Sequence, residues 1–218
     1  YTDATGTSAR FYRPRGITTD GTNLYVADMY NHRIRKIVID NGTVTTLAGS
    51  SSGSTDATGT SAKFSSPWAI TTDGTNLYVA DTSNNMIRKI VIATGAVTTF
   101  AGNPGSTGST NATGTSARFK NPYAIATDGT NLYVSDSSNQ MIRKIVISTG
   151  AVTTLAGSTS SGSTDATGTS ARFNSPQGIT TDGTNLYVTD STNQMVRKIV
   201  IATGAVTTLA GYPGSSGS

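Results

Sequence analysis

Apolar residues fall into short stretches of four to six positions, separated by residues that favour turns. Between residues 16 and 48 there are four such stretches, at 16–19, 24–27, 34–39 and 43–48. They are rich in Val, Ile, Thr and Tyr, the residue types enriched in β-strands. The intervening segments 20–23 (Asp-Gly-Thr-Asn) and 40–42 (Asp-Asn-Gly) have turn composition. The pattern therefore predicts four consecutive antiparallel strands.

The same pattern occurs four times along the chain. The turn aspartates Asp20, Asp73, Asp128 and Asp182 lie 53, 55 and 54 residues apart, so each repeat is about 54 residues long. A connector rich in Ser, Gly and Thr separates the repeats and ends in Phe-x-x-Pro. We therefore divide the chain into repeats at approximately 1–49, 50–102, 103–157 and 158–211, with 212–218 as a connector tail.

Tandem units of four antiparallel strands predict an all-β fold, a single β-propeller domain with four blades per chain. A single sheet of this size cannot bury both faces, whereas stacked blades cover one another. A β-solenoid is the alternative, but its repeats are usually shorter and lack such hairpin turns. Two arrangements remain open: a closed four-bladed monomer, or half of an eight-bladed ring made by a two-fold homodimer.

Several motifs resemble the NHL-repeat family of β-propellers. They are Phe11-x-x-Pro14-x-Gly16-Ile17, Leu24-Tyr25-Val26-Ala27-Asp28, Asn31-His32-Arg33-Ile34-Arg35-Lys36 and Val44-Thr45-Thr46-Leu47-Ala48-Gly49. Related strings recur in the same order in all four repeats, although only the first keeps the Asn-His pair. The resemblance implies a propeller whose first strand in each blade lies nearest the axis. It departs from the family in blade number, since NHL propellers most often have about six.

Composition limits the chemistry that the chain can perform. The 218 residues include no Cys, no Glu, one His and one Trp, and only 13% are charged. Disulfides, Cys-ligated zinc and a site built from several His ligands are therefore excluded within one chain. Some NHL-like propellers are metal-dependent lyases or hydrolases, but those chemistries use several His or carboxylate ligands, and Gly-x-Ser-x-Gly is absent. We expect no enzymatic activity, no cofactor and no metal.

Residues that recur in every repeat are interpreted as structural. An aspartate follows the second strand and an arginine lies in the third; the two sets are Asp28, Asp81, Asp136 and Asp190, and Arg35, Arg88, Arg143 and Arg197. A buried arginine needs a carboxylate partner, so we predict an Arg–Asp bridge in each blade. Each connector also carries one Asp, replaced by Asn111 in the third. Calcium requires six to eight oxygen ligands, so a surface turn or short helical cap is the better interpretation.

Residues that differ between repeats are candidates for a binding site. The residue after the connector proline is Arg15, Trp68, Tyr123 or Gln177. Further variation in the first repeat falls in the neighbouring loops, at Tyr12, Arg13, Tyr30 and His32. Trp, Tyr and Arg are enriched at binding hot spots. We predict a non-catalytic binding module that presents this loop face to a protein, peptide or glycan. The alternative is a structural, engineered or amplified scaffold without a ligand, whose exposed loops varied after duplication.

Charge and hydropathy restrict the partners further. The formal charge is +4, and the cations on the predicted face, including Arg10, Arg13, Arg15 and Arg33, are confined to the first repeat. Nucleic-acid proteins usually carry a broader basic surface, which argues against a nucleic-acid partner. No apolar run reaches 18 residues, so no transmembrane helix is expected. The lack of Cys and the Ser/Thr/Gly richness suit a secreted or cell-surface protein.

Overall fold

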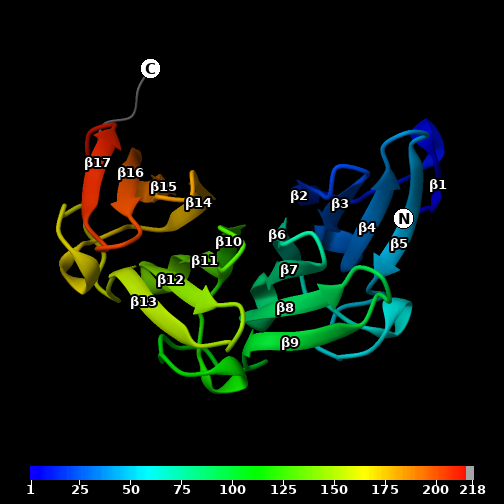
Figure 1. The fold of residues 1–218 in the computed structure, drawn as a ribbon, viewed down its shortest axis with the longest axis horizontal. Coiled ribbons are helices and arrows are strands. Elements are labelled where there is room, and N and C mark those ends of the chain that lie inside the picture. Colours follow the sequence, from blue (N-terminus) through cyan, green and yellow to red (C-terminus); the bar gives the residue numbers. More distant parts are fainter. Residues whose placement is uncertain (215–218) are drawn as a thin grey trace. The chain divides into compact units, whose positions relative to one another are not determined.

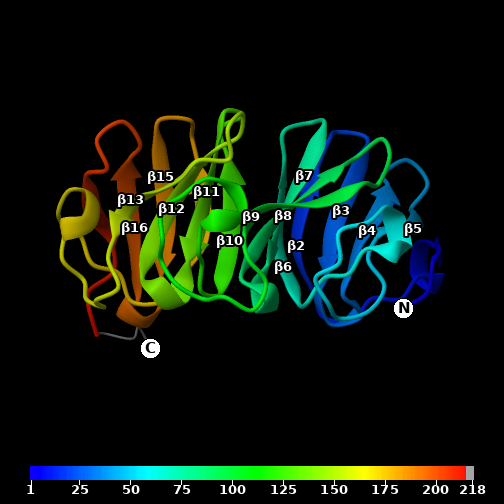
Figure 2. The same cartoon turned by 90° about the horizontal axis from the view of Figure 1, so that it is seen from below.

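The computed structural model describes residues 1–214 as antiparallel sheets joined by loops and short 3-10 helices (Figures 1 and 2). Each repeat forms one antiparallel sheet, of five strands in the first repeat and four in each of the others, and the all-β prediction is confirmed. We call the sheets blades 1 to 4 in chain order. The last four residues of the tail predicted at 212–218 lie outside the described residues. None of the helices within residues 1–214 is long and apolar enough to cross a membrane.

Blade 1 contains the four predicted strands and one short additional strand. Its members are β1 (Ala4–Thr5), β2 (Pro14–Thr19), β3 (Asn23–Asp28), β4 (Arg33–Val38) and β5 (Thr43–Ala48). The spatial order is β1-β5-β4-β3-β2, so the connector pairs with the last strand of the blade that it precedes. The predicted turn at 20–23 forms because Asp20 Oδ1 accepts hydrogen bonds from the N–H groups of Thr22 and Asn23.

The other three blades repeat this arrangement without the additional strand. Blade 2 contains β6 (Pro67–Thr72), β7 (Asn76–Asp81), β8 (Met86–Val91) and β9 (Val97–Gly102). Blade 3 contains β10 (Pro122–Thr127), β11 (Asn131–Asp136), β12 (Met141–Val146) and β13 (Val152–Gly157). Blade 4 contains β14 (Pro176–Thr181), β15 (Asn185–Asp190), β16 (Met195–Val200) and β17 (Val206–Ala210).

Two short 3-10 helices accompany each blade. One lies in the connector, in agreement with the predicted turn or short helical cap: η1 (Gly6–Ser8), η3 (Gly59–Ser61), η5 (Gly114–Ser116) and η7 (Gly168–Ser170). The other follows the second full-length strand: η2 (Met29–Asn31), η4 (Thr82–Asn84), η6 (Ser137–Asn139) and η8 (Ser191–Asn193). This second helix carries part of the candidate site.

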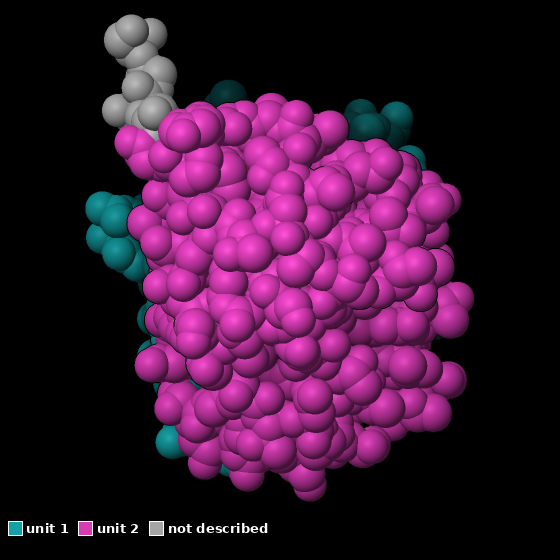
Figure 3. All heavy atoms as spheres, turned by 90° about the vertical axis from the view of Figure 1, so that its left-hand side faces the viewer, with its two compact units in different colours: residues 1–105 teal, residues 106–218 magenta. Residues whose placement is uncertain are grey.

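The chain consists of two compact units, residues 1–105 and 106–218 (Figure 3). Unit 1 holds blades 1 and 2, with β2 beside β6 (Figure 2), and unit 2 holds blades 3 and 4, with β10 beside β14. In each unit, one sheet face of the earlier blade packs against one sheet face of the later blade. The unit 1 core combines Tyr25, Ala27, Ile34 and Ala48 of blade 1 with Ala62, Phe64, Ile70, Leu77, Val79, Ile90 and Val97 of blade 2.

Candidate functional site

The candidate site of unit 1 begins where two loops of blade 1 run side by side. The N–H of Tyr30 in η2 donates to the carbonyl oxygen of Tyr12, just before β2, over 3.1 Å. The loop between β3 and β4 is thereby held against the segment that precedes β2. The same backbone bond joins Ser83 to Ser65, Ser138 to Lys120 and Thr192 to Asn174 in the other blades.

The residue before each blade proline has an unusual backbone conformation. Arg13 has φ of 51°, in the left-handed region, and Ser66, Asn121 and Ser175 have φ between 51° and 56°. A non-glycine residue enters this region at a cost, and a residue before proline normally prefers extended conformations. The conformation persists because surrounding bonds hold the loop, including one of 2.7 Å from the Tyr12 N–H to Asp28 Oδ1.

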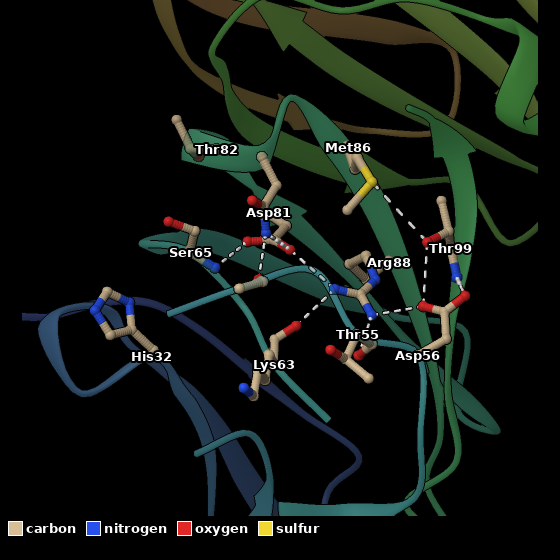
Figure 4. Close-up of polar contacts among 12 residues, drawn as sticks. His32, Thr55, Asp56, Lys63, Ser65, Asp81, Thr82, Met86, Arg88 and Thr99 are labelled. Carbon is tan, nitrogen blue, oxygen red and sulfur yellow. Dashed lines mark hydrogen bonds and ion pairs between the residues drawn. The ribbon is translucent and has the colours of Figure 1, made fainter. Parts of the chain in front are cut away.

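A buried arginine network supports these loops, and Figure 4 shows it in blade 2. Arg88 Nη1 donates to Asp81 Oδ2 at 3.0 Å and to the Lys63 carbonyl oxygen at 2.8 Å. Its Nη2 donates to Asp56 Oδ1 at 2.6 Å and to the Thr55 carbonyl oxygen at 3.0 Å. The guanidinium carbon lies 5.0 Å from the centre of the Phe64 ring. One arginine therefore ties the third full-length strand of the blade to its connector.

The network recurs in every blade. The buried Arg–Asp pairs are Arg35–Asp28 at 3.0 Å, Arg143–Asp136 at 2.8 Å and Arg197–Asp190 at 2.8 Å. Each arginine lies at a register shift between the last two strands of its blade, where a bulge can re-aim a side chain. Burial outweighs the Asn84 and Arg88 donors and raises the pKa of Asp81 to about 6. The Arg88 guanidinium, 3.0 Å from Asp81 Oδ2, opposes this rise because it favours the ionised carboxylate.

These aspartates position the loop face. Asp81 Oδ1 accepts the N–H of Ser65, and its Oδ2 accepts Asn84 Nδ2 in the 3-10 helix. One carboxylate thus holds both loops at that end of the blade. In each connector, sequence reasoning missed the second partner of the arginine: Asp3, Asp56 or Asp165, with Asn111 as its counterpart. A polar Asp or Asn recurs at this position in every connector, and that recurrence was the signal that could have revealed the second partner.

Exposed aromatic and cationic side chains gather on the loop face of blade 1. The Tyr12 and Tyr30 rings meet edge to face, with centres 5.0 Å apart. The Arg13 guanidinium carbon lies 4.8 Å from the Tyr30 ring centre, and Arg13 Nη1 donates to the Tyr30 hydroxyl at 3.2 Å. Tyr12 is 55% exposed and Tyr30 is 37% exposed. Three sequence-predicted residues therefore form one contiguous surface.

A second pair joins blades 1 and 2. The Arg15 guanidinium carbon lies 4.4 Å from the Trp68 ring centre. The two residues meet because β2 and β6 approach closely: a Cβ atom on Gly16 would lie 2.7 Å from the Ala69 Cα. Tyr123 and Gln177 occupy the matching positions in β10 and β14 of unit 2. The pairing of Arg15 with Trp68 is thus a feature of unit 1.

His32 lies at the edge of this face and links its two blades. It has φ of 55°, and its Nδ1 accepts the Ser66 N–H at 3.1 Å. Burial and the nearby Arg33 charge lower the pKa of His32, which favours the neutral ring that this bond requires. Gln140 makes the corresponding bond in unit 2, from the Ser175 N–H to its Oε1 at 2.6 Å. His32 therefore has a structural bond in addition to its predicted place on the loop face.

Sequence reasoning also missed Tyr1. The Arg33 guanidinium carbon lies 3.5 Å from the Tyr1 ring centre, and Arg33 Nη1 donates to the Asn31 carbonyl oxygen. Tyr1 is 58% exposed. Tyr1 stands where the other three connectors have Ser54, Ser109 and Ser163, and this difference between repeats was the signal that could have revealed it.

Tandem four-stranded antiparallel blades with a buried arginine in each define a repeat protein of the β-propeller class. A family model described as NHL repeat matches residues 11–37. NHL repeat-containing protein 2 of Homo sapiens is 29% identical over 96% of this chain and 34% of its own length. Protein SUPPRESSOR OF QUENCHING 1, chloroplastic, of Arabidopsis thaliana is 30% identical over 97% of this chain and 22% of its own. The family-model match and the relatives named NHL repeat-containing protein 2 support an NHL-repeat family for this chain.

Solved structures share the fold at low sequence identity. An auxiliary nutrient binding protein from Bacteroides ovatus has a TM-score of 0.68 at 18% identity, over 93% of this chain and 50% of that protein. A streptogramin B lyase has a TM-score of 0.61 at 12% identity, over 95% of this chain and 57% of the lyase. The chain thus spans about half the length of these structures and 22% to 34% of the two curated relatives.

Proposed function

We propose that the chain is a non-catalytic binding module and that the loop face of blades 1 and 2 recognises a protein, peptide or glycan. The observation that carries the proposal is the pairing of guanidinium groups with aromatic rings, Arg15 with Trp68 and Arg13 with Tyr30. Blade 4 has Gln177, Asn174 and Ser175 at the corresponding positions of Arg15, Tyr12 and Arg13. Blade 3 has Tyr123, Lys120 and Asn121 there. Both guanidinium–ring pairs of the proposed site belong to unit 1.

The chemistry of this face suits peptide or sugar ligands. Aromatic rings offer flat apolar surfaces, and a guanidinium group donates hydrogen bonds in a fixed planar geometry to carboxylates, carbonyls or hydroxyls. Stacking on an aromatic ring also orients the guanidinium before a ligand arrives, which lowers the entropic cost of binding. A nutrient-binding protein with the same fold supports a binding role at a coarse level.

The residues of the face favour binding over catalysis. Its only imidazole, His32, already accepts a backbone N–H at Nδ1. The buried aspartates Asp28 and Asp81 are engaged by arginine and backbone donors within their blades. The aromatic and guanidinium groups of the face bind and orient ligands rather than transfer protons at neutral pH.

Trp68 supplies a direct test because it is the only tryptophan in the chain. We would screen peptide and glycan arrays with the purified protein and measure the affinity for each hit by isothermal titration calorimetry, with Trp68 fluorescence as a second readout for the variants that retain Trp68. Arg15→Ala and Trp68→Ala are expected to weaken binding about tenfold or more, as hot-spot residues do. Gln177→Ala is the matched control at the same position in blade 4 and should bind like wild type.

Two results would contradict the proposal. Equal loss of binding in Gln177→Ala and Arg15→Ala would place the ligand elsewhere. The absence of any array hit and of any fluorescence change would favour the alternative, a structural repeat scaffold without a ligand.

A further inference from the structure

One sheet face of blade 1 is apolar and has no blade packed on it within unit 1. Ile17 is 58% exposed and Ile39 is 50% exposed. Phe11, Pro14, Arg15, Val26 and Ile37 lie beside Ile17 around a hollow of about 290 Å³. Monomeric soluble proteins rarely leave contiguous apolar surface of this kind uncovered. We call this surface the first face of blade 1.

The repeats show what this face is built to contact. The positions that form it are Phe11, Ile17, Leu24, Val26, Ile37, Ile39 and Val44. Their counterparts in blade 2 are Phe64, Ile70, Leu77, Val79, Ile90, Ile92 and Val97, all within or against the unit 1 core. Their counterparts in blade 4 are Phe173, Ile179, Leu186, Val188, Ile199, Ile201 and Val206, all within or against the unit 2 core. In both units, this face packs against the preceding blade. It contacts the sheet face of that blade that lies opposite to its first face, and we call that opposite surface the second face.

Blade 4 carries the surface that is complementary to the first face of blade 1. Its second face carries Tyr187, Val196 and Leu209, and Leu209 is 57% exposed. Tyr187, Thr189 and Val196 border a hollow of about 320 Å³. The counterparts of Leu209 are Leu47 in blade 1 and Leu155 in blade 3, and both pack against the cores of their units. The second face of blade 4 therefore repeats a surface that elsewhere receives the first face of a following blade.

We propose that the second face of blade 4 in one copy of this chain packs onto the first face of blade 1 in a second copy. Each molecule carries both halves of an interface that its own units form between blades 1 and 2 and between blades 3 and 4. In a solution of the pure protein, a second copy is the partner that always offers the complementary half. The contact is head to tail, because it joins two different surfaces.

The proposal does not rest on the function proposed for the loop face, and its test uses other residues. Lysine at the exposed positions Ile17 or Leu209 places a charge in one half of the interface without entering the core of either unit. The control is Thr207→Lys, because Thr207 is exposed and its counterparts Thr45, Thr98 and Thr153 are exposed in every other blade. Circular dichroism checks that each variant keeps its sheets.

Light scattering over a dilution series measures the mass. Wild type and Thr207→Lys are expected to have the mass of two or more chains. Ile17→Lys and Leu209→Lys are each expected to have the mass of one chain. Mixing these two variants should restore a species of two chains, because Ile17→Lys retains an intact blade 4 face and Leu209→Lys an intact blade 1 face.

Three outcomes would overturn the proposal. Wild type with the mass of one chain at every concentration would exclude association of copies. Disruption by only one of the two lysine variants would indicate contact between identical faces. Failure of the mixture to recover a two-chain species would contradict head-to-tail pairing. Arg15 borders the same hollow as Ile17, so ligand binding is compared between wild type and Leu209→Lys, which leaves Arg15 and Trp68 untouched. With that comparison the two proposals fail separately.

Discussion

Asn111 shows how a single residue can make one blade differ from the others. In blades 1, 2 and 4 the connector aspartate uses one oxygen for the buried arginine and the other for a strand N–H, such as Asp165 Oδ2 to Thr208 at 2.9 Å. Asn111 keeps the first bond, from Arg143 Nη2 at 2.8 Å. Its amide nitrogen is a donor and cannot accept a bond from a strand N–H. Blade 3 thus lacks a charge-assisted contact that the other blades have.

We therefore predict that Asn111→Asp stabilises the protein. The carboxylate sits at a partly exposed site, so the gain should be about 1 kcal/mol in the free energy of unfolding, measured by urea denaturation. Asp165→Asn is the reciprocal control and should cost a similar amount. A destabilised Asn111→Asp protein would contradict this account of the connector.

The turn aspartates make the free energy of unfolding depend on pH in the acidic range. Asp182 accepts hydrogen bonds from the backbone and side chain of Asn185, from the Thr184 N–H and from the Tyr187 hydroxyl. These bonds hold the pKa of Asp182 well below its ordinary value of 3.8. Because the folded-state pKa is depressed, the contribution to stability is present above the unfolded-state pKa. It is lost as the pH falls below that value.

Comparison with Asp182→Asn isolates this effect. The amide does not titrate in this range, so the advantage of wild type in Tm should be largest near about pH 6 and should shrink toward about pH 2. Thermal melts followed by circular dichroism across this range provide the measurement. A difference in Tm that does not change with pH would show that the turn carboxylate is not responsible.

At the scale of the strand, the buried arginine holds each blade together. Arg88 lies at the register shift of β8 and β9 and bonds to two aspartates and two connector carbonyls. Substitution by an apolar residue leaves Asp81 buried and without its counter-charge. The same substitution frees the connector from the strand. The strand, its bulge and the connector thus depend on one side chain.

Arg88→Met is expected to destabilise the protein by about 3–5 kcal/mol, as removal of one partner from a buried ion pair does. Adding Asp81→Asn should recover about 1 kcal/mol, because the remaining buried charge is removed. Lys89→Met, the neighbouring position on β8, is the control and should change stability by less than about 0.5 kcal/mol. Similar costs for Arg88→Met and Lys89→Met would show that the network contributes little.

At the scale of the whole molecule, the two units can be observed separately. The sole tryptophan, Trp68, lies in unit 1, whereas circular dichroism reports on the strands of all four blades. Arg197 donates hydrogen bonds to residues of unit 2, including Asp165 and Asp190. Substitution of Arg197 is therefore expected to lower the stability of unit 2 more than that of unit 1.

Arg197→Met is therefore expected to lower the urea midpoint seen by circular dichroism more than the midpoint seen by Trp68 fluorescence. Arg88→Met in unit 1 is the control and should lower the Trp68 midpoint. Equal shifts of both signals in Arg197→Met would show that the units unfold together, as a single cooperative system does.

The repeat pattern of the sequence determined the local architecture. Strand positions, the Asp-Gly-Thr-Asn turns and the Arg–Asp bridges follow from residue types that recur at a spacing of 53 to 55 positions, because each blade must form the same bonds. The short additional strand β1 was not anticipated, since a connector rich in Thr and Gly has no strand pattern. The connector partner of each arginine, a carboxylate in three blades and Asn111 in the third blade, was missed because it is 32 residues away in the chain.

The tertiary structure alone decided which variable residues meet. Arg15 and Trp68 are 53 positions apart, and only the close approach of β2 and β6 stacks them. It also decided that His32 bonds to the following blade and that identical sheet faces differ in burial, as Ile17 and Ile70 do. Local sequence specifies the bonds that a strand makes within its own sheet. Contacts between sheets depend on which surfaces stacking brings together, and equivalent repeats carry no local signal for that choice.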